Sequence, residues 1–246
     1  MVGWQRKTVI LLFWLILWQI VSDRIASPIY LVGPIETVQA ALRLVVTSSF
    51  WQAVWGSLAR IGAGFALAFL GGLLCGSLAH FWPLFGELLS PVVSLMKTVP
   101  VASFVILALI WAEAEQLALV ISFVVVFPMI YLNTVAGLEA TDPQLLEMAR
   151  VFRVSSWQRL WQIYRPALAP YLLSACQVAL GMSWKSGIAA EVIGTPEFSI
   201  GENLYMAKVF FSTDELFAWT AVVIVLSFLF EKGILWILRR ITCVGT

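Results

Sequence analysis

Two charged residues lie inside an apolar segment, Lys185 and Glu191 in A-L-G-M-S-W-K-S-G-I-A-A-E-V-I-G at Ala179–Gly194. Six residues correspond to about 600° around a helix, so the two lie on different faces and do not pair within it. Charges in such segments are costly and usually face a cavity or a partner. Lys185 therefore either attracts a passing anion or pairs with a carboxylate, on a neighbouring helix or as Glu191 of a second copy. Glu191, nearer the end of the segment, is either a gate contact or an interfacial carboxylate.

Proline interrupts two other apolar segments, at Pro100 and Pro128. Broken helices often flank translocation paths, although proline is also common in ordinary membrane helices. Pro100 therefore joins the two charged residues as a candidate pathway residue. Arg60 and Lys97 are expected near the ends of apolar segments, where long side chains reach the headgroups and have a structural role.

The composition places the chain in a lipid bilayer. Of its 246 residues 61% are hydrophobic and 12% are charged, and the mean hydropathy is +0.93. Soluble domains carry roughly a quarter charged residues, so this chain lacks the polar surface to cover itself in water. A net charge of +1 without a long basic run excludes a nucleic-acid partner. A membrane enzyme is disfavoured because H-E-x-x-H and G-x-S-x-G are absent.

Six segments of the chain are apolar and close to the length of about 20 residues that a membrane-spanning helix needs. We expect spans at Thr8–Val21, Trp55–Ala79, Val92–Trp111, Leu117–Ala136, Leu168–Ile193 and Leu216–Leu238. The first is short and follows Arg6 and Lys7, as a signal peptide would. Trp14 and Trp18 and the lack of a clear small-x-small cleavage site favour a retained membrane anchor instead.

Basic residues orient the six spans. They gather before the first span, between the fourth and fifth, and after the sixth: Arg6, Lys7, Arg150, Arg153, Arg159, Arg165, Lys232, Arg239 and Arg240. With six spans these clusters fall on one side, which the positive-inside rule makes the cytoplasm. We therefore expect a multi-pass protein with both termini in the cytoplasm. Small residues at every fourth position, Gly64, Ala68, Gly72 and Gly76, predict close helix packing in a bundle.

The segment between the fourth and fifth spans is expected to form two short helices. Asp142 can cap a helix that begins at Pro143, where a missing amide costs nothing. Ser155 can cap a second helix, with Gln158 completing a capping box, and Pro166 is expected to end it. Apolar residues among the arginines suit docking into a groove on a soluble partner: Leu146, Met148, Phe152, Trp157, Leu160 and Trp161.

This loop resembles the cytoplasmic signature of the binding-protein-dependent permeases of type I ABC importers. That signature runs Glu-Ala-Ala, three residues, Gly, nine residues, Ile, one residue, Leu, Pro, and four positions keep its register: Glu147, Ala149, Ile163 and Pro166. Met148, Arg153 and Arg165 replace the first Ala, the Gly and the Leu. In relatives the Gly is expected in the turn between two coupling helices, so Arg153 implies a different turn or a strained one.

The resemblance covers nearly the whole chain and looks like the nitrate, sulfonate, taurine and bicarbonate branch. It is carried by S-L-A-R-I-G-A-G-F at Ser57–Phe65, K-T-V-P-V-A at Lys97–Ala102, F-F at Phe210–Phe211, and Ala179–Gly194. It implies an all-α polytopic protein with six transmembrane helices and a two-helix cytoplasmic coupling loop. Residues 1–246 would form one permease domain, with an N-terminal span and external segment in residues 1–50 and the core fold in residues 51–240.

The resemblance also implies a division of labour in a bacterial inner membrane. The chain would form half of a pore for a small anionic solute, beside a second permease copy (most simply as a homodimer, otherwise a sister permease). An ATPase would dock at Glu147, Ala149, Arg153, Ile163 and Pro166, and an extracytoplasmic binding protein would deliver the substrate. No G-x-x-x-x-G-K-[ST] occurs here, so ATP and Mg²⁺ would bind the ATPase, and this chain would hold no cofactor and be no enzyme. Two alternatives stay open: a heterocyclic vitamin precursor as substrate, and a non-ABC secondary transporter.

Overall fold

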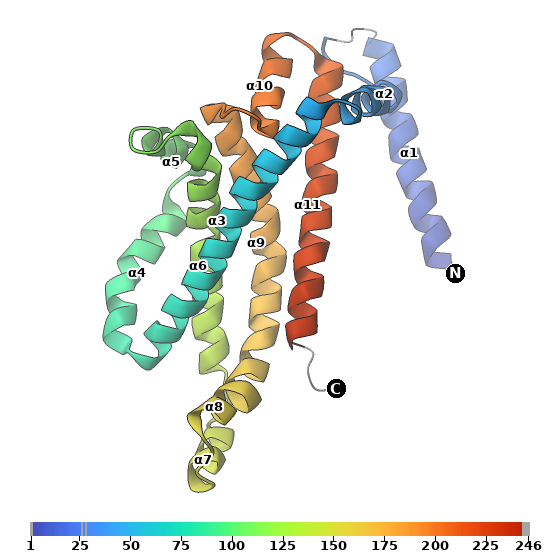
Figure 1. The fold of residues 1–246 in the computed structure, drawn as a ribbon. Helices are drawn as coiled ribbons and strands as arrows, with labels where there is room; N and C mark the ends of the chain where they lie inside the picture. Colours follow the sequence, from blue (N-terminus) through green and yellow to red (C-terminus); the bar gives the residue numbers. More distant parts are fainter. Residues whose placement is uncertain (1, 26, 28, 243–246) are drawn as a thin grey trace.

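The computed structural model describes residues 2–25, 27 and 29–242, and in this part of the chain the regular elements are all helices (Figure 1). They are α1 (Val2–Ile25), α2 (Pro34–Val45), α3 (Ser48–Phe81), α4 (Pro83–Thr98), α5 (Val101–Ala108), α6 (Ala114–Glu139), α7 (Pro143–Val151), α8 (Ser156–Arg159), the π-helical η1 (Leu160–Tyr164), α9 (Arg165–Gly194), α10 (Ile200–Val209) and α11 (Thr213–Thr242). The expected all-α fold class is confirmed.

Five helices are long and apolar enough to cross a membrane alone: α1, α3, α6, α9 with the elements before it, and α11. The bent pair α4 and α5 makes the sixth crossing when it is counted as one broken span. This agrees with the expected six spans. The bundle has α10 at one end, and α7 and α8 project from the other (Figure 1).

The third expected span, Val92–Trp111, is interrupted at Pro100 as the sequence predicted, but its bounds differ. The chain instead enters α4 at Pro83 and turns by 105° between α4 and α5. The cause is Pro100, which has no amide to donate and disfavours helical geometry at the residue before it. Val99 accordingly has an extended ψ of 126°. The second proline does not act this way, because Pro128 lies inside an uninterrupted α6.

The expected helix end at Pro166 is also wrong, because α8, η1 and α9 form one continuous helix from Ser156 to Gly194. In the π-helical turn the amide of Arg165 donates to the carbonyl of Leu160, five residues back. A proline inside a regular helix clashes with the carbonyl four residues earlier. The wider π turn just before Pro166 relieves that clash, so the fifth span and the second loop helix are one rod.

The core is the packing of α6 between α3 and α9. The predicted small-residue stripe of α3 makes this contact: a Cβ added to Gly72 would lie 2.9 Å from Cβ of Ile130, and one added to Gly76 would lie 2.7 Å from Cβ of Thr134. With no Cβ in the way, the two helix backbones approach closely. Trp184 of α9, 1% exposed, fills the space beside this seam.

The N-terminal part of the chain attaches at the α10 end of the bundle. There the indole of Trp18 on α1 donates to the carbonyl of Val32 at 3.0 Å, and its ring lies 5.7 Å from that of Phe217. Helix α2 packs against α11, and Arg43 pairs with Asp214 at 2.9 Å. Helices α2 and α10 lie outside the six spans expected from the sequence.

Candidate functional site

Helix α7 opens the loop between the fourth and fifth spans as the sequence predicted. Pro143 occupies its first turn, and the Asp142 carboxylate accepts from the amide of Gln144 at 2.8 Å. The two signature residues on α7 face in opposite directions. Glu147 is exposed, whereas Ala149 is 1% exposed and packs inside its own chain.

The turn after α7 places Arg153 in the left-handed region, with φ of 49°. Its amide donates to the carbonyl of Arg150 at 3.1 Å, and the amide of Val154 donates to that of Ala149 at 2.8 Å. These two bonds make a Schellman motif, which ordinarily places glycine at the left-handed position. Of the two turns expected for Arg153, the structure has the strained one.

Helix α8 starts with the predicted capping box. The amide of Gln158 donates to the Ser155 hydroxyl, and the Gln158 side chain accepts from the amide of Ser155, both at 3.3 Å. The remaining two signature positions follow along the same rod. Ile163 lies in the π turn and is half-buried, and the exposed Pro166 lies in the first turn of α9.

Apolar side chains cover the outside of this projecting loop. Between about 40% and 80% of each is exposed: Leu145, Met148, Val151, Phe152, Trp157, Leu160 and Trp161. Arg165 lies 4.5 Å from the ring of Trp161, and Trp157 packs on Trp161 edge to face. Contiguous exposed apolar surface with such a charged border is typical of a protein–protein contact.

Lys185 lies on a face of α9 that no helix in the described part of the chain covers. Exposed residues recur there at helical spacing over about three turns: Ser174, Gln177, Val178, Met182 and Lys185. Among the described residues Lys185 has no hydrogen bond or ion pair. The exposed middles of α3 and α11 carry only apolar residues apart from Thr220, so the uncovered face of α9 is the polar one.

Glu191 lies instead in a closed cluster at the α10 end, and it is fully buried. Its Oε2 accepts from the Ser57 hydroxyl at 2.6 Å and from the amide of Gly201 at 3.2 Å. The Arg60 guanidinium lies 3.7 Å from Oε1 and also donates to the carbonyl of Glu197 at 2.8 Å. Glu191 is therefore no interfacial carboxylate, and it is not free to pair with Lys185 of a second copy.

The cluster ties three elements together. Ser57 and Arg60 come from α3, Glu191 from α9, and the amides of Ile200 and Gly201 from the start of α10. Arg60 was expected to snorkel to the headgroups, which is wrong, because its side chain is 19% exposed and is held by protein oxygens. The sequence signal was present: Ser57 and Arg60 are three residues apart and so share a helix face.

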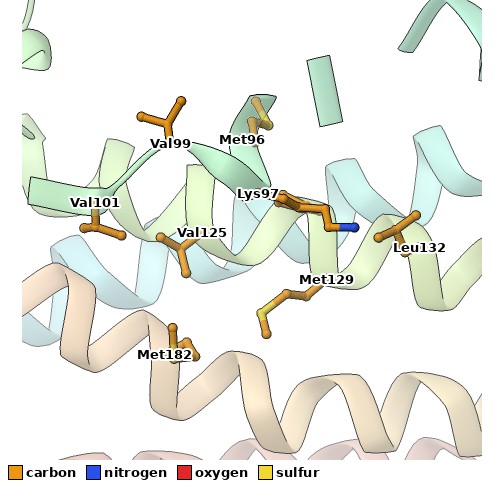
Figure 2. Close-up of a pocket in the computed structure, with 9 residues that line it drawn as sticks. Met96, Lys97, Val99, Val101, Val125, Met129, Leu132 and Met182 are labelled. Atoms are coloured by element: carbon orange, nitrogen blue, oxygen red, sulfur yellow. The ribbon is translucent and has the colours of Figure 1, made fainter. Parts of the chain in front are cut away.

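A cavity of about 300 Å³ lies where the α4–α5 bend meets α6 and α9. The residues on either side of Pro100, Val99 and Val101, both line it. The full lining is Met96, Lys97, Val99, Val101, Val125, Pro128, Met129, Leu132 and Met182. Figure 2 shows the Lys97 side chain extending along α6 toward Leu132. We call this cavity the Lys97 pocket. Sequence reasoning missed it, because the bend that forms it is not evident from hydropathy.

Comparison with known proteins identifies the chain. Residues 68–241 match the family described as binding-protein-dependent transport system inner membrane component. The chain belongs to this family. The curated relatives include the taurine transport system permease protein TauC of Escherichia coli (strain K12), 26% identical over 92% of this chain and 84% of the relative. The putative aliphatic sulfonates transport permease protein SsuC of Bacillus subtilis (strain 168) is 26% identical over 88% and 79%.

A third relative widens the range of named solutes. The bicarbonate transport system permease protein CmpB of Synechococcus elongatus is 29% identical over 78% of this chain and 72% of the relative. These findings confirm the expected resemblance to ABC importer permeases of the nitrate, sulfonate, taurine and bicarbonate branch. The chain is thus a multi-pass membrane component of a transport system rather than an enzyme.

Proposed function

We propose that this permease forms half of the substrate pore of an ATP-driven importer and docks a separate ATPase through α7 and α8. The observation that carries the proposal is the projecting loop, whose exposed aromatic and aliphatic side chains have no cover in this chain. Aromatic anchors of this kind dominate the binding energy of protein interfaces. ATP and Mg²⁺ are then held by the ATPase, and Glu147 meets it directly. Ala149 and Ile163 shape the loop from within, whereas the exposed Arg153 sets its turn and the exposed Pro166 lies where the loop passes into α9.

The continuous helix supplies the mechanical link. Because α8, η1 and α9 form one rod from Ser156 to Gly194, a displacement of α8 by the ATPase moves α9 as well. The polar face of α9, with Lys185 on it, is where such a movement changes the pathway. The π turn between them is the position at which the rod can adjust its register.

The same polar face indicates how two copies assemble. Ser174, Gln177 and Lys185 on α9 have no partner helix among the described residues, and polar side chains are expensive to expose to lipid. Two permeases that meet around these faces enclose a polar pathway, whereas the apolar outer surfaces of α3 and α11 meet lipid. We propose a homodimer, with Lys185 and the Pro100 bend along the pathway and Glu191 bracing its far end.

Orientation and substrate complete the proposal. Helix α1 begins and α11 ends on the side of the bundle toward α7 and α8, which the arginines of that loop mark as cytoplasmic (Figure 1). The binding protein then docks at the α10 end. The substrate is a small anion, since two uncompensated ammonium groups, Lys97 and Lys185, lie along the uncovered side and the relatives named above include permeases for sulfonates and bicarbonate.

Docking through the loop is tested by co-purification of the ATPase with the permease. Phe152→Glu removes an aromatic side chain that is 75% exposed and places a charge in the contact. We expect about 30-fold weaker ATPase binding, since such anchors are worth about 2 kcal/mol or more. Ala140→Glu, at an exposed position just before the loop, is the matched control and should bind normally. Undiminished binding by the Phe152 variant would rule out this surface as the dock.

A further inference from the structure

The Lys97 pocket has the composition of a binding site for a small ion with an apolar part. We propose that it binds an organic monoanion with a short alkyl tail, such as an alkanesulfonate, with the acidic head at Lys97 Nζ and the tail against the methionines. The inference rests on the proposed function, for which it names a substrate class and a site. It separates organic anions from the inorganic anions that some relatives carry.

The position of the pocket along α6 and α9 argues against a headgroup contact for Lys97. Met129 and Met182 lie near the middles of α6 and α9, which span 26 and 30 residues. A bilayer core of about 30 Å puts these middles about 15 Å from either headgroup layer. The lysine stem reaches only about 6 Å, so its ammonium cannot arrive there. In this proposal Lys97 faces the pocket and not the headgroups, because α4 ends at the 105° bend beside α6 and α9.

The charge of Lys97 has no internal compensation. Within the described part of the chain it forms no ion pair, and no acidic side chain lines the pocket. An ammonium at this depth is expensive unless something offsets its lost hydration. A transient anion supplies that charge, and a lone contact lets the anion leave again, as passage requires.

The other lining groups define the ligand class. Apart from Lys97, every lining side chain is apolar: three methionines, three valines, a leucine and a proline. Nitrate and bicarbonate carry oxygen atoms on every side, so binding them requires several hydrogen-bond donors. The Lys97 ammonium is the one side-chain donor that lines this pocket. A single charged head with an alkyl tail matches it, since methionine adapts its shape to small apolar groups. The volume of about 300 Å³ lies at the small end of known ligand sites.

The pocket opens onto the polar face of α9. Met182 forms its α9 wall, and Lys185 lies three residues further on, so both occupy the same side of that helix. Lys185 lies one turn beyond Met182, so a second ammonium lies on the same face of α9 as the wall of the pocket. This places the pocket beside the proposed pathway rather than on the lipid-facing surface.

A cysteine reporter tests the site directly. Met182→Cys is introduced after replacing Cys75 and Cys176 with Ala, and Cys243, which lies outside the described residues, with Ser. The permease with its ATPase is placed in phosphatidylcholine nanodiscs and labelled with N-ethylmaleimide. We expect propanesulfonate to slow labelling about tenfold, because an ion pair against an apolar wall is worth more than one in bulk water. Neutral propanesulfonamide and nitrate should have little effect.

Variants at Lys97 decide the outcome. Lys97→Met should abolish protection by propanesulfonate, and Lys97→Arg should retain it. Equal protection in the Met variant, no protection in the parent, or equal protection by nitrate would each overturn the proposal. Protection that appears only when phosphatidylglycerol is added would assign the pocket to a lipid and overturn it too. Val125→Cys on the opposite wall replaces the reporter if Met182→Cys does not assemble.

The proposed docking of the ATPase is measured separately on the same samples. ATPase co-purification reports whether α7 and α8 dock, and it does not depend on Lys97. Loss of ATPase binding with intact protection would therefore refute the docking proposal alone. Normal ATPase binding without protection would refute the Lys97 pocket alone.

Discussion

Arg153 holds the turn between α7 and α8 in a conformation that its side chain disfavours. A residue with a Cβ in the left-handed region costs about 1–2 kcal/mol, whereas glycine adopts it freely. The φ of 49° is nevertheless fixed by the two Schellman bonds of Arg153 and Val154. The family motif carries glycine at this position, and the chain here keeps the turn geometry without it.

Replacing Arg153 with glycine should therefore stabilise the loop. We expect about 1 kcal/mol, seen as roughly fivefold slower hydrogen exchange of the Val154 amide, which bonds to Ala149. Arg153→Ala is the control, because it removes the guanidinium and keeps the backbone penalty. If the alanine variant slows exchange as much as glycine does, the side-chain charge and not φ governs the turn.

The buried Glu191 cluster depends on contacts between helices, which the spacing of residues along the sequence does not predict. Sequence reasoning placed Ser57 and Arg60 on one helix and Glu191 on another, without a rule to join them. The structure joins them because Gly201 brings the start of α10 against Glu191, so closely that an added Cβ would overlap the Glu191 side chain and backbone. A buried carboxylate is tolerable only with such donors around it.

At the scale of elements, the α3–α6 seam depends on missing side chains. Gly72→Ala would bring a Cβ within 2.9 Å of Ile130 Cβ and within 3.0 Å of the Tyr131 amide. Overpacking of this kind costs about 1–3 kcal/mol, and we expect a lower Tm of the purified permease. Gly62→Ala on the same helix meets only the Phe230 ring, at 3.7 Å, and should hold or raise Tm because alanine favours helix. A Tm that falls equally in both variants would contradict a specific role for the seam.

Local chemistry made some elements predictable. Asp142, Ser155 and Gln158 act within three residues of themselves, so their caps followed from sequence alone and are confirmed. The small-residue stripe of α3 likewise follows from helical spacing. Hydropathy found the six crossings, because each one needs a run of apolar residues whatever the fold.

Other elements depend on the balance between helix breaking by proline and packing between helices, which cannot be judged from the sequence alone. Pro100, Pro128 and Pro166 all lie in apolar helices, but only Pro100 breaks its helix. Pro128 is held by the packing of α6 between α3 and α9, and Pro166 by the π turn before it. The Lys97 pocket follows from the Pro100 bend, so it escaped prediction for the same reason. The short α10 is set by its packing on α9 and α11.

At the scale of the whole molecule, one helix connects the two functional regions. The rod from Ser156 to Gly194 starts in the projecting loop, passes Met182 at the Lys97 pocket and Lys185 on the polar face, and ends beside the Glu191 cluster. In the proposed mechanism, a force applied at α8 thus reaches the pathway and the α10 end along one continuous helix. Coupling in the proposed mechanism then needs only a rigid-body shift of α9.

The most direct test of this account is binding-protein-stimulated ATP hydrolysis, measured together with uptake, in the reconstituted importer. Glu147→Arg reverses an exposed charge on α7 at the proposed contact, and Glu139→Arg reverses another exposed charge at the same end, outside the loop. We predict that the Glu147 variant loses uptake and keeps only unstimulated hydrolysis, at least tenfold below the stimulated rate, since reversed charges at an interface cost several kcal/mol. The Glu139 variant should behave like the parent. Stimulated hydrolysis and uptake at parental levels in the Glu147 variant would contradict coupling through this loop.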